Sequence, residues 1–112
     1  MSGKPLVWVG TTPDRLRRFP AGARREAGYQ LRRVQLGEEP SDWKPMRSVG
    51  AGVVELRMHA EGENRVLVVT RFAEAIYVLH AFEKKTQQTR QTDLELGRRN
   101  LAAVLQHRRR RS

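Results

Sequence analysis

The sequence predicts a single α+β domain with a short strand, two helices, three antiparallel strands and a final helix. Three observations support this class. The chain has 112 residues, which is enough for one hydrophobic core. Apolar residues recur at helical spacing near both ends, and they alternate with polar residues in the middle. We expect the order β-α-α-β-β-β-α, with the helices in one layer and the sheet in the other, so that one sheet face is free to bind a partner.

The N-terminal part of the chain is expected to hold the first strand and a helical hairpin. Residues 4–9 form the strand, and Thr12 caps the helix that follows it. Pro20 ends this helix and opens the next, because proline is tolerated in the first turn of a helix and not in its interior. The apolar stripe of the second helix consists of Ala23, Ala27, Leu31 and Val34. Gly37 ends that helix, and residues 38–42 are expected to form a polar loop, with prolines at positions 40 and 45.

The middle of the chain is expected to form strands over residues 53–58, 65–72 and 75–82. The connections between them are short, so the strands are antiparallel neighbours. Alternation in the first strand places Val54, Leu56 and Met58 on one face and Val53, Glu55, Arg57 and His59 on the other. The third strand is nearly all apolar, which is typical of a strand whose two faces are both covered.

The C-terminal part of the chain predicts the last helix. Thr92 and Glu95 have the spacing of a capping box at its start. The apolar residues on one side of this helix are Leu94, Leu101, Val104 and Leu105. Residues 108–111 are all arginine, and we expect them to fray. The predicted domain therefore covers residues 1–107, followed by a basic tail over residues 108–112.

Charge and composition narrow the partner classes. The formal net charge is +10, and most of the positive charge is arginine. Because guanidinium groups pair with phosphate, this balance favours a polyanionic partner, although a general arginine bias in codon usage contributes too. The absence of cysteine excludes disulfides, thiolate metal sites and cysteine nucleophiles, and the three histidines lack metal-site spacing, so no metal or cofactor is expected. No stretch has the length of a signal peptide or membrane span, which predicts a cytoplasmic protein without membrane contact.

Four strings in the β part follow one another in a familiar order. They are K-P-M at residues 44–46, G-A-G-V-V-E-L-R at 50–57, R-V-L-V at 65–68 and V-L-H-A-F-E-K-K-T at 78–86. Over about residues 4–105 the chain resembles the RelE/HigB-like toxins of type II toxin–antitoxin systems, especially the phage-associated HigB-type branch. The resemblance implies a RelE/ParE-like fold.

The resemblance also implies an activity and its partners. The activity is that of a metal-independent endoribonuclease, an mRNA interferase, which cuts messenger RNA on the ribosome and inhibits translation. The expected partners are the ribosome with its messenger RNA and a cognate antitoxin, usually a helix-turn-helix protein of the HigA type. Operator DNA would be contacted only through that antitoxin.

The candidate catalytic residues are cations that strand geometry could gather. Cutting RNA without a metal needs a group that takes the 2′-hydroxyl proton, charges that hold the phosphate, and a donor to the leaving 5′ oxygen. Arg57 and Arg65 are expected to share a face across a hairpin, with Lys84 and Lys85 at the end of the next strand. Clustered cations lower one another's pKa, so that one lysine could act as acid or base. His80 is a further candidate.

Each of these residues has a structural alternative. Arg57 could pair with Glu55, the lysines could be solvated strand-end charges, and His80 could be a buried core histidine. Glu55 is itself a candidate base, although the RelE pattern often has a lysine in its place. The residues expected to bind RNA are Arg24, Arg25, Arg32, Arg33, His59 and Tyr77. The arginines are expected to contact ribosomal RNA phosphates rather than the cleaved one. His59 could instead be a residue of the turn, and Tyr77 could fill the core.

Three other functions remain open from the sequence. The first is a ParE-like toxin that poisons DNA gyrase on a related fold. The second is a catalytically degenerate toxin-fold protein that binds an antitoxin or RNA. The third is a general RNA-binding module, against which the missing paired aromatic residues of an RRM sheet count.

Overall fold

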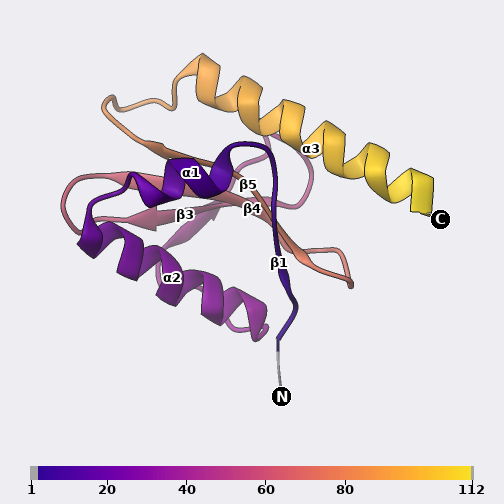
Figure 1. Cartoon of the computed structure of the whole chain (residues 1–112). Helices are drawn as coiled ribbons and strands as arrows, with labels where there is room; N and C mark the ends of the chain where they lie inside the picture. The colour runs from indigo at the N-terminus through magenta and orange to yellow at the C-terminus, as the bar shows by residue number, and fades with distance from the viewer. Residues whose placement is uncertain (1–2, 112) are drawn as a thin grey trace.

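The computed structural model describes residues 3–111 and contains one five-stranded sheet and three helices (Figure 1). The strands are β1 (Leu6–Trp8), β2 (Trp43–Pro45), β3 (Val53–Met58), β4 (Asn64–Val69) and β5 (Ile76–Glu83), and the helices are α1 (Thr12–Arg17), α2 (Ala21–Gln35) and α3 (Gln91–Arg111). The sheet order is β1-β5-β4-β3-β2, with β1 parallel to β5 and every other neighbour antiparallel. This architecture confirms the predicted α+β domain.

Helices α1 and α2 cover one face of the sheet. The predicted stripe of α2 is buried, and it packs on the residues of β3 and β4 that point the same way, Leu56, Met58, Val66 and Val68. α2 begins directly after Pro20, and Gly37 follows its end with a φ of +77°, as predicted. The prediction for Thr12 is wrong. Its hydroxyl donates to the carbonyl oxygen of Val9 at 2.6 Å, and Thr11 occupies the N-cap position instead.

Helix α3 covers the opposite face, above the sheet in Figure 1, where α2 lies below it. Leu101 and Val104 of α3 pack with Leu67 and Val69, the residues of β4 that point away from α2. The close approach needs Gly97, because a Cβ atom there would lie 3.0 Å from Leu67 Cδ1. The expectation of a single helical layer with a free sheet face is therefore wrong, since the apolar side of α3 also needs a surface to cover. The two covered faces confirm the interpretation of the apolar strand β5.

Strand β2 is an element that the sequence did not predict. Its backbone pairs antiparallel with β3, with Lys44 opposite Glu55 and Pro45 opposite Val54. The prolines favoured a loop at this point, but proline is compatible with an edge strand, where one side of the backbone needs no partner. The strand matters for function because it carries Lys44 to the same sheet face as Glu55.

The arginine-rich end of α3 is helical through Arg111, so the expected fraying does not occur in the described residues. Arg108 anchors this end. Its Nε donates to Glu74 Oε2 at 2.6 Å, and its guanidinium lies 3.8 Å from the centre of the Phe72 ring. The dipole of a helix also favours cations in its last turn. Within residues 3–111 no helix is both long enough and apolar enough to span a bilayer.

The Glu74–Arg108 contact predicts how acid affects the fold. The hydrogen bond from Arg108 is the main cause that lowers the pKa of Glu74 from 4.5 to about 2. A carboxyl with a lowered folded pKa stabilises the fold above its unfolded pKa, and this contribution is lost as the pH falls from about 4.5 to about 2. We expect Arg108→Ala to weaken the dependence of unfolding free energy on pH in this window, as measured by urea unfolding. If Arg108→Ala left the pH dependence of the unfolding free energy unchanged between about pH 4.5 and 2, the role of the Glu74–Arg108 contact would be contradicted. Arg110→Ala, which removes another arginine of the same helix end, is the matched control.

Candidate active site

Strand register brings two of the predicted catalytic arginines together. Arg57 of β3 and Arg65 of β4 are direct cross-strand partners, so both side chains lie on the face that α3 partly covers. Glu55 precedes Arg57 by two residues and therefore shares this face. Lys44 of β2 is the cross-strand partner of Glu55. The predicted sharing of one face by Arg57 and Arg65 is confirmed.

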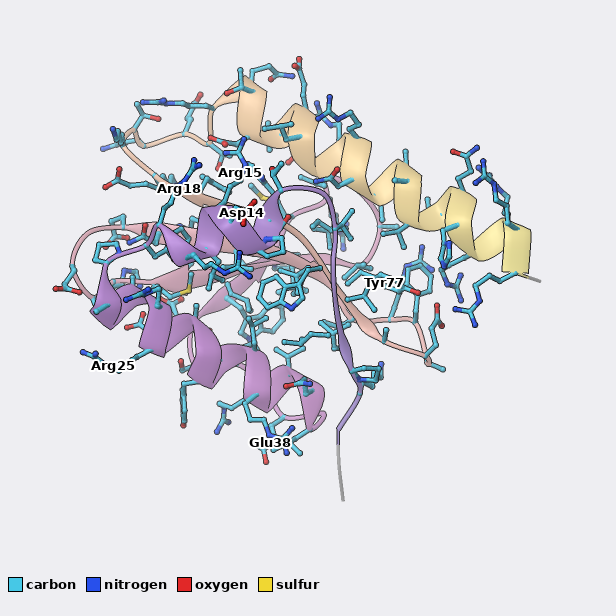
Figure 2. The ribbon with its side chains drawn as sticks, in the orientation of Figure 1. Asp14, Arg15, Arg18, Arg25, Glu38 and Tyr77 are labelled. Atoms are coloured by element: carbon cyan, nitrogen blue, oxygen red, sulfur yellow. The ribbon has the colours of Figure 1, made fainter. Side chains whose placement is uncertain are left out.

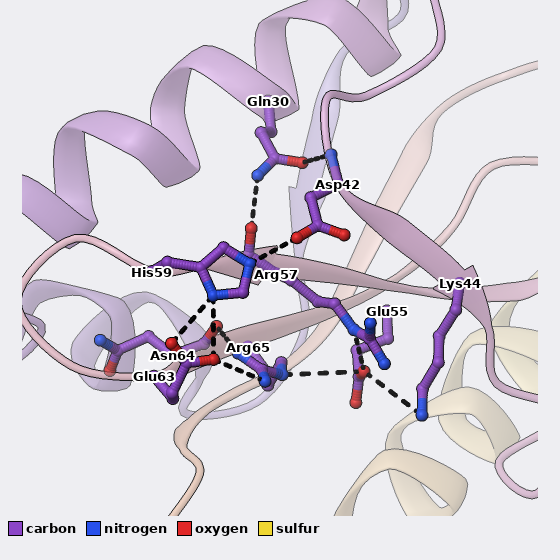
Figure 3. A network of polar contacts seen from close by, with 9 residues as sticks. All are labelled: Gln30, Asp42, Lys44, Glu55, Arg57, His59, Glu63, Asn64 and Arg65. Carbon is purple, nitrogen blue, oxygen red and sulfur yellow. Dashed lines mark hydrogen bonds and ion pairs between the residues drawn. The ribbon is translucent and has the colours of Figure 1, made fainter.

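Glu55 is the centre of this group, which we call the Glu55 cluster and define as Lys44, Glu55, Arg57, Arg65 and Lys84. Figure 3 shows the first four of these residues. Glu55 has no exposed surface. Its Oε1 lies 3.3 Å from Arg57 Nε, 3.7 Å from Arg65 Nε and 4.0 Å from Lys44 Nζ. Three cations thus contact one carboxylate, and a fourth, Lys84, is close enough to interact with it electrostatically, so the cluster retains an excess of positive charge that suits a phosphodiester.

The cluster contains polar atoms whose hydrogen-bonding capacity is not used. Glu55 Oε2 and Arg65 Nε are both buried and form no hydrogen bond with any described residue. The separation of 3.7 Å between Glu55 Oε1 and Arg65 Nε is too long for a hydrogen bond. Leaving such groups unpaired costs free energy. The cluster thus keeps one unused donor, on Arg65, and one unused acceptor, on Glu55.

Arg65 is held more firmly than its neighbours. Only 6% of its side chain is exposed, and its Nη1 donates to the carbonyl oxygen of Asn64 at 2.9 Å. Its Nη2 donates to Glu63 at 2.9 Å, and Glu63 also contacts His59. His59 Nε2 contacts Asp42, and the two carboxylates, Asp42 first, raise the pKa of the histidine. This chain of contacts fixes the guanidinium before any ligand arrives.

Lys84 follows the last residue of β5 and completes the cluster. Its backbone amide donates to the carbonyl oxygen of Glu63 at 2.8 Å, which fixes the strand end beside the β3–β4 turn. Partial burial lowers the pKa of its ammonium group, and the charges of Arg65, Lys44 and Arg57 lower it further, while Glu55 acts in the opposite direction. A lysine with a lowered pKa can exchange protons nearer neutral pH.

The remaining catalytic candidates lie elsewhere. His80 is 1% exposed, its Nε2 lies 2.8 Å from Asp93 Oδ1, and burial lowers its pKa. This is the environment of a core histidine, the structural alternative. Lys85 points to solvent, with 63% of its side chain exposed, and lies 3.6 Å from Glu83. Within residues 3–111, neither His80 nor Lys85 forms a hydrogen bond or ion pair with a member of the Glu55 cluster.

The candidate RNA-binding residues lie in different parts of the fold and do not form one surface with the Glu55 cluster. Tyr77 is buried, and its hydroxyl donates to Glu74 at 2.8 Å, so its ring fills the core rather than a surface for base stacking. The helical candidates, Arg24, Arg25, Arg32 and Arg33, belong to α2, which covers the face opposite the Glu55 cluster. Figure 2 shows Arg25 pointing outward from α2. His59 supports the turn that holds Arg65. RNA contacts by these residues remain predictions.

Sequence reasoning did not include Lys44 among the site residues. The signal was present, because Lys44 belongs to the K-P-M string and Trp43 and Met46 flank it as apolar residues. The short strand could be recognised only from its partner β3, which supplies every backbone hydrogen bond of the pairing. Side chains from β2, β3, β4 and the residue after β5 thus form the site.

A comparison with protein-family models identifies relatives of the chain. No curated protein matches the chain significantly. The model described as "Phage derived protein Gp49-like" matches residues 14–102 of the 112 residues. This match begins within α1, ends within α3 and includes all five members of the Glu55 cluster. The chain therefore belongs to the phage-derived Gp49-like protein family, which is related to the toxins of toxin–antitoxin systems.

Proposed function

We propose that the protein is the toxin of a type II toxin–antitoxin system and inhibits translation by cutting messenger RNA on the ribosome. The observation that carries this proposal is the Glu55 cluster, in which one buried carboxylate contacts three cations and interacts electrostatically with a fourth, Lys84. Such a group can hold a phosphodiester and stabilise the added negative charge of its transition state. The family relationship supports the toxin class. The resemblance of the four sequence strings to the HigB-type branch supports RNA as the target.

The proposed reaction is an internal transfer within the RNA. The 2′ oxygen attacks the neighbouring phosphorus, the bond from phosphorus to the 5′ oxygen breaks, and a cyclic phosphate and a 5′ hydroxyl result. Lys84 in its neutral form takes the proton of the 2′-hydroxyl, and the charged Lys44 gives a proton to the leaving oxygen. Arg57 and Arg65 hold the phosphate oxygens. Solvent then restores the protonation states of the two lysines.

Glu55 has a positioning role in this scheme. Glu55 is buried, and its Oε1 lies within 4.0 Å of a nitrogen of Arg57, Arg65 and Lys44. Its charge keeps Lys44, Arg57 and Arg65 together when no RNA is bound. The lysine that the RelE pattern often has in place of Glu55 is supplied here by Lys44 from the adjacent strand β2.

The partners follow from the same proposal. The toxin would act in the cytoplasm on ribosomes carrying messenger RNA. A cognate antitoxin, expected to be a helix-turn-helix protein of the HigA type, would neutralise it and carry the complex to operator DNA. Co-purification of the chain with the product of a neighbouring short gene tests this part separately from the activity.

A translation extract tests the activity. Purified protein is added to ribosomes programmed with a defined messenger, and the 5′ ends of the fragments are mapped by primer extension. We expect cuts that depend on both ribosomes and protein. The same preparation is tested on gyrase supercoiling. Blocked supercoiling without messenger cuts would support the ParE-like alternative, and no effect in either assay would support a degenerate protein.

The dependence of cleavage on pH tests the coupling between Glu55 and Lys84. The carboxylate of Glu55 raises the pKa of Lys84, so Glu55→Gln should lower it further. The limb of the rate profile that reports Lys84 should therefore move to lower pH, whether this residue acts as base or as acid. A profile that only loses amplitude, with its limbs in place, would contradict the coupling. Glu38→Gln on the loop after α2 is the control.

A further inference from the structure

His59 lies between two carboxylates next to the Glu55 cluster (Figure 3). Its Nδ1 lies 2.9 Å from both carboxylate oxygens of Glu63, and its Nε2 contacts Asp42. A neutral imidazole carries a proton on only one ring nitrogen, whereas an imidazolium carries one on each. Because an ionised carboxylate accepts hydrogen bonds and cannot donate them, only the imidazolium can donate to Asp42 and Glu63 at the same time. The arrangement of the two carboxylates therefore favours the protonated form of His59.

The two carboxylates belong to segments that carry proposed catalytic cations. Glu63 lies in the turn between β3 and β4, and its Oε1 accepts a hydrogen bond from Arg65 Nη2 at 2.9 Å. Asp42 directly precedes β2, the strand that carries Lys44. His59 thus connects the turn that positions Arg65 with the strand that positions Lys44.

Both segments have local features that make such a connection useful. β2 has only three residues, so its pairing with β3 supplies few backbone hydrogen bonds. The β3–β4 turn holds Glu61 at a φ of +57°, in the left-handed region that is costly for residues other than glycine. Contacts with α2 fix this turn, because Gly22 N donates to Glu61 at 2.6 Å and His59 N donates to Glu26 at 2.8 Å. The ring of His59 extends this support from the turn to the start of β2.

The charges around His59 favour a proton on its ring. The charged side chains that face His59 or its immediate contacts are Asp42 before β2, Glu63 of the β3–β4 turn, Glu26 of α2, Arg57 of β3 and Arg65 of β4. The two arginines are each paired with a carboxylate, Arg57 with Glu55 and Arg65 with Glu63. The contact with Asp42, and after it the contact with Glu63, raises the pKa of His59 above its ordinary value of 6.5, while slight burial acts in the opposite direction.

We propose that His59 is a positioning residue whose protonated ring joins the start of β2 to the β3–β4 turn and so holds Lys44 and Arg65 in place, an inference that rests on the proposed RNA-cutting function. This role requires no contact between His59 and RNA. When the ring loses its proton, one of the two carboxylates faces a nitrogen without a hydrogen, and the two segments are no longer joined.

The direction of the pH effect follows from the raised pKa of His59. A group with a raised folded pKa stabilises the fold fully below its unfolded pKa, and this contribution is lost as the pH rises through the folded pKa. The connection should therefore be complete up to about pH 6.5 and should be lost above it. Cleavage should fall with rising pH in this window, whereas a lysine that acts as general base makes the rate rise with pH. The two effects are thus opposite in sign.

NMR of the full chain, labelled with ¹⁵N and ¹³C, tests the connection without any need for cleavage. The Cε1–H signal of His59 and the buried Nε–H signal of Arg65 are followed as a function of pH. We expect the His59 signal to titrate with a midpoint above 6.5 and the Arg65 signal to shift with the same midpoint. Asp42→Asn and Glu63→Gln should each lower the midpoint of His59. A midpoint at or below 6.5, or an Arg65 signal that does not follow it, would overturn the inference.

Single-turnover cleavage on programmed ribosomes tests the positioning role. The ratio of the wild-type rate to that of His59→Ala is taken at each pH, so that the pH dependence of the ribosome cancels. We expect a ratio of about ten to a hundred below the midpoint, since a displacement of about 1 Å in a catalytic group can cost about 10²-fold, and a ratio near one above it. A ratio that is the same at every pH would overturn the inference. His107→Ala, which removes an exposed histidine of α3, is the control and should follow wild type throughout.

His59→Arg keeps the inference testable if the alanine variant folds poorly. Arginine stays protonated at all accessible pH values and has enough donors for two carboxylates, so this variant should cut RNA without the fall above the wild-type midpoint. A rate that still falls at that midpoint in His59→Arg would overturn the role of His59 while leaving the proposed cleavage intact. A protein that cuts no RNA would contradict the proposed function, and the NMR titration would still decide whether His59 joins the two segments.

Discussion

Arg65→Ala is expected to lower the rate of RNA cleavage by about 10²–10³-fold, the range measured when one charge-stabilising donor is removed from an active site. Arg65 is the most buried cation of the Glu55 cluster, and contacts to Asn64 and Glu63 fix its guanidinium. A charge fixed in this way needs no reorganisation when the phosphate gains negative charge. The loss should appear in kcat, measured as single-turnover cleavage on programmed ribosomes.

The same substitution affects stability, and the two effects must be separated. Without Arg65, the buried Glu55 keeps only Arg57 and Lys44 as partners, so we expect the free energy of unfolding to fall by about 1–3 kcal/mol. Cleavage is therefore measured at a temperature at which urea titration shows the variant to be folded. Arg65→Lys keeps the charge and loses the paired geometry of the guanidinium, and it should recover stability more than rate. If folded Arg65→Ala cut RNA at the wild-type rate, the catalytic residues would have to lie outside the Glu55 cluster. Arg17→Ala, which changes an exposed arginine of α1, is the control and should leave the rate unchanged.

Much of the fold could be predicted because its signals are local. Three predictions depended only on residues close in sequence, and the structure agrees with all three. They are the apolar stripe of α2, the ends of that helix at Pro20 and Gly37, and the alternation in β3. The side of the sheet on which α3 packs is a different kind of property. Two amphipathic elements can cover the same face or opposite faces, and only the complementarity of their surfaces decides. Here Gly97 allows α3 to approach Leu67 closely on the second face.

The candidate site was predictable where it depended on one hairpin. Alternation and a short turn were enough to place Arg57 opposite Arg65. Lys44 could not be found in this way, because β2 has three residues and exists only through pairing with β3. The burial of Glu55 was also hidden, since a carboxylate on a polar strand face is usually exposed. Its burial follows from the cations that surround it, which come from separate parts of the chain.

The second large effect is expected at Lys84. Lys84→Ala should lower the cleavage rate by about 10²–10⁴-fold, the contribution of a positioned acid or base. The choice of this lysine over its neighbour rests on environment. Burial and three nearby cations lower the pKa of Lys84, whereas Lys85 is largely exposed beside Glu83. Lys85→Ala should therefore cause a much smaller loss, and equal losses in the two variants would show that neither has a special role in proton transfer.

A rate loss alone does not distinguish proton transfer from phosphate binding, because both would be lost with the ammonium group. Lys84→Arg separates them, since arginine keeps the positive charge but stays protonated at all accessible pH values. If Lys84 transfers a proton, Lys84→Arg should stay nearly as slow as Lys84→Ala and should lose the limb of the pH profile that wild type shows. If Lys84 only binds phosphate, the arginine should restore most of the rate. The second result would leave the clamp of Arg57 and Arg65 in place and would assign the proton transfer to another group on the same face.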